Sequence, residues 1–197
     1  MKRFGLILFL SLLSLFPLRS QTVEEAREKL LAFSAKVSAI ECDFVQTKTS
    51  SLLAEDIVSS GHMSYRKPGY LSWDYRKPDP LTFLADGDRI TLTRGGQETS
   101  LGGNQGRMIR EMTRMIVGNI DGSVLSDTKT FKADVSLTDD SIVATLVPQK
   151  KELKRMWSKL VLYYDRTTLE ATRFEMHEAS GDRTVITFTN IKYAFSE

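Results

Sequence analysis

The sequence has few of the residues on which catalytic and metal-binding sites usually depend. One Cys and two His among 197 residues cannot form an internal disulfide, a Cys-rich zinc site or a His-based metal centre. Walker, G-x-S-x-G, H-E-x-x-H and strand-linked G-x-G-x-x-G motifs do not occur. His177 has Glu175 and Glu178 nearby but no recognisable nucleophile. We therefore expect a protein that is not an enzyme and that needs no metal or cofactor.

Long hydrophobic runs are absent beyond the first twenty residues. Lys2 and Arg3 precede an apolar run, Phe4–Leu18, and Ser20 supplies a small residue before Gln21. The run is shorter than the roughly 20 residues that cross a bilayer, and Pro17 interrupts its end. This pattern predicts a cleaved signal peptide over residues 1–20 and an exported domain over residues 21–197.

An excess of charge of one sign is also absent. The chain has 27 Lys and Arg against 25 Asp and Glu, and without the predicted signal peptide the balance is 24 against 25. A nearly neutral protein lacks the excess of positive charge that attracts the phosphate groups of nucleic acid. We expect the lone Cys42 to be a buried, small apolar residue.

One local cluster of cations departs from this balance. It comprises Lys150, Lys151, Lys154, Arg155 and Lys159. The cluster could contact an anionic membrane surface. A solvated face is the simpler interpretation, because Glu152 interrupts the run and the whole chain is close to neutral.

Helical spacing at the start of the exported chain gives way to strand spacing. Thr22 and Glu25 have the spacing of a capping box, and the apolar residues that follow predict a helix over residues 22–39. Alternation then predicts a strand around Cys42 and Phe44, followed by strands over 57–66, 70–75, 81–85, 89–93, 131–137, 142–147, 159–165, 168–178 and 183–195. No crossover helices separate these strands, so a single curved antiparallel sheet of about ten strands is expected.

Helical spacing returns once, over residues 105–120. Its apolar residues lie on one side of the predicted helix: Met108, Ile109, Met112, Met115 and Ile116. Unbranched Met side chains adapt to variable ligands, although a Met stripe on a helix is more often part of a core.

Apolar residues on three strand faces are candidates for lining a cavity. They are Leu71, Trp73 and Tyr75 on one strand, Leu160, Leu162 and Tyr164 on another, and Phe174 and Met176 on a third. If the strands curl without filling the interior, these side chains line a cavity. Periodicity alone favours the alternative, in which they pack against a helix.

Several motifs occur in a recognisable order near the first strands. They are D-F-V-Q at 43–46, S-G-H-M at 60–63, Y-R-K-P-G-Y-L-S-W-D-Y at 65–75, Pro80 and D-G at 86–87. In this order they resemble the landmarks of the periplasmic outer-membrane lipoprotein carrier family, LolA. The resemblance spans nearly all of the exported chain, and residues 44–87 are its most specific part.

The resemblance implies a mainly β (α+β) fold, in which an unclosed antiparallel half barrel has a hydrophobic interior covered by helices. It implies a periplasmic chaperone that accepts acylated lipoproteins from an ABC-type exporter of the inner membrane and carries them to the outer membrane. We expect a monomer, and the outer-membrane acceptor is left open.

The resemblance also assigns roles to residues. Leu71 and Trp73 stand where the family places cavity-facing side chains, and the helix over residues 105–120 would be the cover. The family has a lid-latching arginine just before Pro68, where this chain has Lys67 preceded by Arg66. Lysine lacks the planar fork of arginine, so Lys67 would hold the lid more loosely, or Arg66 would act from the opposite face of the strand.

Two other functions fit the same fold. One is a carrier of a different lipid or glycolipid. The other is a regulatory lipid sensor that binds a membrane signalling protein.

Overall fold

The computed structural model describes residues 22–103, 106, 115–118, 120 and 122–196. Its N-terminal half contains α1 (Val23–Lys36), β1 (Val37–Thr49), β2 (Ile57–Arg66), β3 (Tyr70–Lys77), β4 (Leu81–Asp86), β5 (Arg89–Arg94) and β6 (Gln97–Ser100). Its C-terminal half contains the 3₁₀-helix η1 (Ser123–Ser126), β7 (Phe131–Leu137), β8 (Ser141–Pro148), α3 (Lys151–Met156), β9 (Trp157–Asp165), β10 (Ala171–Glu178) and β11 (Arg183–Phe195).

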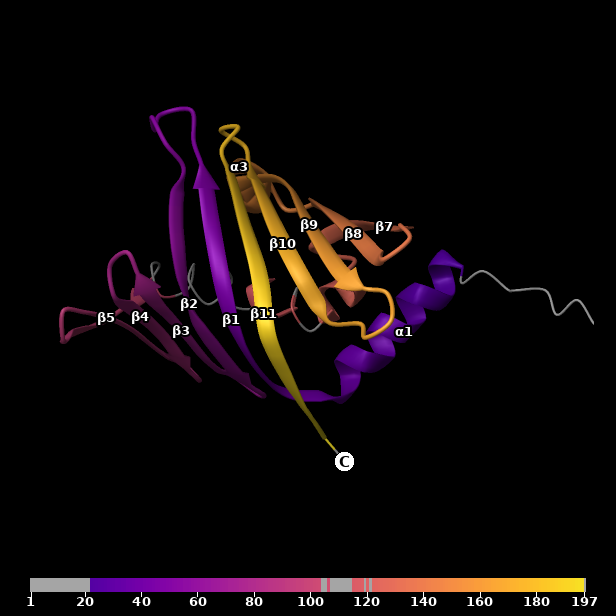
Figure 1. The fold of residues 1–197 in the computed structure, drawn as a ribbon, viewed down its shortest axis with the longest axis horizontal. Helices are drawn as coiled ribbons and strands as arrows, with labels where there is room; N and C mark the ends of the chain where they lie inside the picture. Colours follow the sequence, from indigo (N-terminus) through magenta and orange to yellow (C-terminus); the bar gives the residue numbers. More distant parts are fainter. Residues whose placement is uncertain (1–21, 104–105, 107–114, 119, 121, 197) are drawn as a thin grey trace, which may run out of the picture.

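The strands form one 11-stranded antiparallel sheet with the order β6-β5-β4-β3-β2-β1-β11-β10-β9-β8-β7 (Figure 1). Neighbours in the sheet are neighbours along the chain, except that the first and last strands pair at the centre. Over the described residues, the outermost strands β6 and β7 do not pair, so the sheet is not closed into a barrel. The predicted unclosed antiparallel sheet is therefore confirmed.

Local signals predicted many element boundaries correctly. Strands β2, β7 and β11 have the predicted limits. Helix α1 has the predicted capping box, in which the Thr22 hydroxyl accepts from the Glu25 N–H at 3.2 Å and the Glu25 carboxylate accepts from the Thr22 N–H at 3.0 Å. The helix ends at Lys36, three residues before the predicted end, because Val37 adopts extended geometry and begins β1.

Three elements were not predicted: β6, α3 and the short 3₁₀-helix η1. Strand β6 has four exposed polar residues and therefore no apolar alternation to reveal it. Helix α3 lies within the cationic cluster and has no fully buried residue, so it has no apolar periodicity either.

The predicted second helix falls mainly outside the described residues. Those that are described, including Gly106, residues 115–118 and Ile120, are helical. Met108, Ile109 and Met112 lie outside the described residues.

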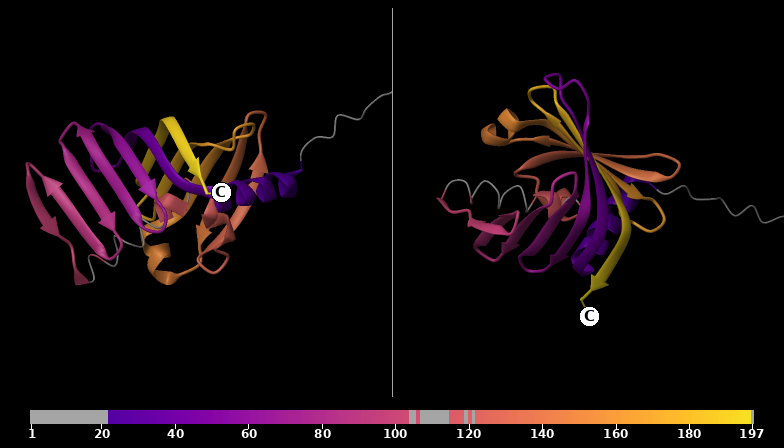
Figure 2. Two further views of the ribbon diagram at one scale, coloured as in Figure 1. Left: turned by 90° about the horizontal axis from the view of Figure 1, so that it is seen from below. Right: turned by 60° about the vertical axis from the view of Figure 1, so that its left-hand side comes forward.

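The sheet curves, with α1 beside its β7 end and η1 inside the curve (Figure 2). Except in the exposed β6, alternate residues of the strands point to the concave side and contribute to the core. At the β7 end, α1 and η1 fill the curve. Gly122 fits between them with φ of 81°, and a Cβ there would lie 3.7 Å from the Leu30 carbonyl oxygen and 3.9 Å from the Tyr164 hydroxyl.

Candidate functional site

An open cavity of about 700 Å³ remains on the concave side, lined mainly by residues of β1, β3, β4, β10, β11 and α3. Its apolar lining comprises Leu71, Trp73, Tyr75, Phe83, Ile116, Met156, Trp157, Met176 and Ile186. Its polar lining comprises Gln46, Lys48, Arg155, Glu178, Ser180 and Thr184. A cavity of this size with mostly apolar walls suits a hydrophobic ligand.

Strand alternation explains the lining. Leu71, Trp73 and Tyr75 are every second residue of β3 and therefore share its concave face. Met176 and Glu178 share the concave face of β10 for the same reason. Strands β3 and β10, which are distant in sequence, thus line the same cavity.

An aromatic cluster forms the wall at β3. The Phe44 ring centroid lies 4.5 Å from that of Trp73 and 5.3 Å from that of Tyr75. The Tyr75 hydroxyl donates to the Gln46 side-chain oxygen at 3.1 Å. Burial raises the pKa of Tyr75, so this phenol stays neutral at physiological pH and adds no charge to the wall.

An ion pair lies at the edge of the cavity. The Lys48 ammonium on β1 is 3.2 Å from a Glu178 carboxylate oxygen at the end of β10. The two side chains are 38% and 30% exposed, so water screens the pair and it contributes little to stability. The main consequence of the ion pair is that one positive and one negative side chain lie beside a mostly apolar cavity.

The candidate cavity residues divide into two groups. Four of the eight line the cavity: Leu71, Trp73, Tyr75 and Met176. The other four lie in the packed core and are only 1–2% exposed: Leu160, Leu162, Tyr164 and Phe174. Leu71 and Trp73 also belong to the core, at 2% and 4% exposure, so they are structural residues as well as lining residues.

Two residues of the predicted covering helix are described. Ile116 lines the cavity, and Met115 packs, partly buried, against the core. Ile116 thus lies at the cavity, which is where a helix that covers the cavity would have to lie.

The two latch candidates have other partners among the described residues. The Lys67 ammonium donates to the Ser34 carbonyl oxygen at 3.2 Å, in the last turn of α1. The Arg66 guanidinium lies 4.5 Å from the centroid of the Tyr70 ring. Contacts with residues 107–114 lie outside the described part of the chain.

Several lining residues were not among the sequence candidates. Phe83 has the same alternation as its neighbours on β4 and could have been found from it. Met156 and Trp157 are hidden in a run of cations. Lys48 and Glu178 are 130 positions apart, so only the fold reveals that they meet.

Among the described residues, no group of three or more His, Cys, Asp or Glu side chains is placed to hold a metal ion. None of the helices described has the length and apolar character needed to cross a bilayer.

Comparison with known proteins identifies relatives of this chain. The family model for outer membrane lipoprotein carrier protein LolA matches residues 35–196. The outer-membrane lipoprotein carrier protein of Methylobacillus flagellatus is 27% identical over 170 residues, which cover 84% of this chain and 77% of that protein.

Two solved structures show a similar fold. One is the Clostridioides difficile CwlD amidase in complex with the GerS lipoprotein, with a TM-score of 0.50 and 15% identity over 89% of this chain and 98% of that chain. The other is the Pseudomonas aeruginosa MucA/MucB complex, with a TM-score of 0.51 and 14% identity over 88% of this chain and 58% of that chain. With the half-barrel fold and the family match over most of its length, the chain belongs to the LolA family of outer membrane lipoprotein carrier proteins.

Proposed function

We propose that this protein is a periplasmic chaperone that binds the acyl chains of lipoproteins in its concave cavity and carries them from the inner to the outer membrane. The observation that carries this proposal is the open, mainly apolar cavity in a member of a carrier family. Residues 1–20 would direct export and be cleaved. An ABC-type exporter of the inner membrane would supply the cargo, and the carrier would act as a monomer.

The physical need for such a carrier follows from the hydrophobic effect. Exposing an acyl chain to water costs about 0.8 kcal/mol per CH₂ group. A lipoprotein with several long chains therefore cannot cross an aqueous compartment quickly by itself. A carrier needs only an apolar cavity with a route of entry, and no bond is made or broken.

The lining residues have distinct parts in this proposal. The packed ring of Trp73 and the neutral phenol of Tyr75 form a fixed wall. Met156 and Met176 are partly buried, and their flexible side chains can adjust to chains of different length. We expect the polar linkage of an acylated cysteine to lie near Lys48 and Glu178, which line the cavity.

Binding of a triacylated cysteinyl peptide tests the proposal. Phe83→Glu introduces a charge into the cavity wall, whereas Leu84→Glu introduces the same charge on the opposite face of the same strand. We expect the Phe83 variant to bind at least tenfold more weakly because a carboxylate in an apolar site is poorly solvated. Equal affinity of both variants, with unchanged circular dichroism, would argue against acyl binding in this cavity.

A carrier of another lipid is a second candidate. Lys48 and Arg155 outnumber Glu178 at the edge of the cavity, and this local charge would also suit an anionic head group. Native mass spectrometry of the protein recovered from its own host separates the two functions. A bound acylated protein supports the lipoprotein chaperone, and a bound free lipid or glycolipid supports the alternative.

A further inference from the structure

The exposed lysines at helix α3, which are Lys150, Lys151 and Lys154, have no part in the carrier function described above. We propose that α3 and the tip of the β1–β2 connection dock the protein on a bilayer containing anionic lipids, with the cavity edge toward that bilayer. This docking goes beyond the proposed function, since it concerns the surface that a carrier presents and not the cargo that it holds.

The cations at α3 are available to a partner. Lys150, Lys151, Lys154 and Arg155 are all exposed. None of them forms an ion pair with another described residue, and Glu152 is the single acid in the helix. The chain as a whole is nearly neutral, so this is a local concentration of positive charge. Such a cluster is attracted to the negative potential of an anionic membrane.

The tip of the β1–β2 connection supplies an apolar contact. Leu52 is 90% exposed and Leu53 is 42% exposed. Glu55 and Asp56 follow them, so the tip adds apolar insertion and the electrostatic attraction comes from α3. An apolar group combined with a basic cluster is the usual composition of a reversible membrane contact.

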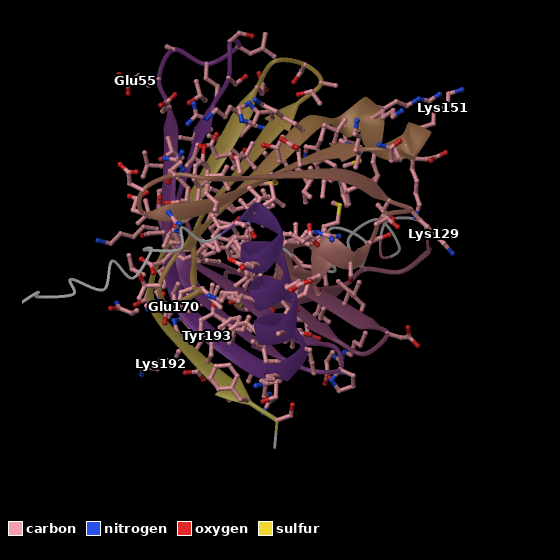
Figure 3. All side chains as sticks on the ribbon, turned by 90° about the vertical axis from the view of Figure 1, so that its right-hand side faces the viewer. Glu55, Lys129, Lys151, Glu170, Lys192 and Tyr193 are labelled. Carbon is pink, nitrogen blue, oxygen red and sulfur yellow. The ribbon has the colours of Figure 1, made fainter. Side chains whose placement is uncertain are left out.

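The two features lie at the same end of the molecule. The β1–β2 connection, the β10–β11 connection and α3 all lie at the end of the sheet opposite the C-terminus (Figure 1). Glu55 and Lys151 appear at the upper end of the molecule and Lys192 at the lower end (Figure 3). One flat surface can therefore contact both features.

The cavity reaches this same end. Arg155 and Met156 of α3 line it, as does Ser180 of the β10–β11 connection. A bilayer in contact with α3 would therefore lie beside the cavity edge. This arrangement would shorten the path of an acyl chain through water.

Vesicle co-sedimentation tests the docking surface. We expect the wild type to bind vesicles of phosphatidylcholine mixed with phosphatidylglycerol and to bind pure phosphatidylcholine vesicles weakly. Lys151→Gln combined with Lys154→Gln should lower the partition coefficient about 30-fold at low ionic strength, because each basic residue near the surface contributes about fivefold. High salt should remove most of this difference.

Two further variants separate the contributions. Leu52→Ser combined with Leu53→Ser should weaken the binding that persists in high salt, since apolar insertion is not screened. Lys29→Gln combined with Lys192→Gln makes the same charge change on α1 and at the lower end, and should bind like the wild type.

The outcomes decide the proposal. Failure of the wild type to bind the mixed vesicles at low ionic strength would overturn it, as would equal binding by the α3 variant. Binding to pure phosphatidylcholine vesicles only after an inner-membrane exporter is reconstituted in them would show that the surface recognises a protein instead. Binding of a triacylated peptide in solution should be unchanged in the α3 variant, so a failed docking test leaves the cargo proposal standing.

Discussion

A single glycine allows the aromatic wall of the cavity to form. Gly61 is on the concave face of β2, opposite Tyr75 in the register with β3. A Cβ at this position would lie 2.8 Å from the Phe44 ring and would clash with the Asp74 carbonyl group. The absence of a side chain therefore lets the Phe44 ring lie against the backbone and reach Trp73.

Gly61→Ala should destabilise the protein by about 1–3 kcal/mol, because the new methyl group overpacks a site bounded by backbone. Gly69→Ala is the matched control, since the nearest atom to its Cβ is 3.9 Å away and its φ is not in the left-handed region. Chemical denaturation should show little change for the control. An equally small change for Gly61→Ala would mean that the Phe44 ring moves aside at low cost.

Asp43 connects three strands on the convex face. Its carboxylate accepts from the Asn190 side chain at 2.8 Å and lies 2.9 Å from His62 Nδ1. The Asn190 hydrogen bond, followed by that of His62, lowers the pKa of Asp43. The folded protein therefore favours the ionised carboxylate, which stabilises the fold above the unfolded-state pKa.

The stability difference between the wild type and Asp43→Asn should shrink as the pH falls below about 4. The reason is that protonation in the folded state removes the advantage of the carboxylate. Urea denaturation at a series of pH values measures this difference. The low pKa values of Asp140 and Asp165 are present in both proteins and cancel in the comparison. A difference that does not shrink below about pH 4 would contradict the assignment.

At the scale of elements, Lys67 joins the β2–β3 turn to the C-terminal end of α1. Its ammonium donates to the Ser34 carbonyl oxygen, and its backbone N–H donates to the Ser38 carbonyl oxygen at 2.9 Å. The Ser34 carbonyl oxygen also accepts from the Val37 N–H, so Lys67 adds a second donor there. A cation at this end of a helix interacts favourably with the helix dipole. In the described contacts, Lys67 therefore stabilises the position of the C-terminal end of α1.

Lys67→Ala should lower stability by about 0.3–1 kcal/mol and speed hydrogen exchange in the last turn of α1. Lys67→Arg should retain slow exchange there, since it keeps the charge and the donors. The lid-latch hypothesis makes a different prediction, which is faster exchange at residues 115–118 with α1 unchanged. Peptide-resolved hydrogen exchange distinguishes the two roles.

At the scale of the whole molecule, the apolar cavity is separate from the part of the core beside α1. That part of the core includes Ile120, Val124 and Leu125. The cavity is lined mainly by residues of β1, β3, β4, β10, β11 and α3. Ligand binding in the cavity should therefore stabilise the folded state without requiring the core beside α1 to rearrange.

A triacylated cysteinyl peptide at about 100 times its dissociation constant should stabilise the protein by about 2.7 kcal/mol. For a chain of this size the thermal midpoint should rise by roughly 5–10 °C. Differential scanning calorimetry measures this shift, and the same peptide without acyl chains is the control. The absence of a shift for the wild type, or a full shift for Phe83→Glu, would count against binding in the cavity.

The sequence by itself determined the local elements of this protein and its family. Strand limits such as those of β2 and β7 follow from alternation and turn residues, and the α1 start follows from the Thr22 capping box, because these depend on neighbours along the chain. The LolA resemblance, carried by the motifs at 43–87, is confirmed by the family match. Strand β6 was missed because its exposed side chains carry no hydrophobic pattern.

Only the tertiary structure decided which inward-facing residues line the cavity. Phe174 and Met176 have the same phase on β10, yet Phe174 lies in the core and Met176 lines the cavity. Alternation specifies the face of a strand, but the depth of a side chain depends on the segments that fill the curve of the sheet. The Lys48 and Glu178 pair likewise depends on the sheet, because β11 brings β1 beside β10. These contacts join distant parts of the chain, so no local pattern contains them.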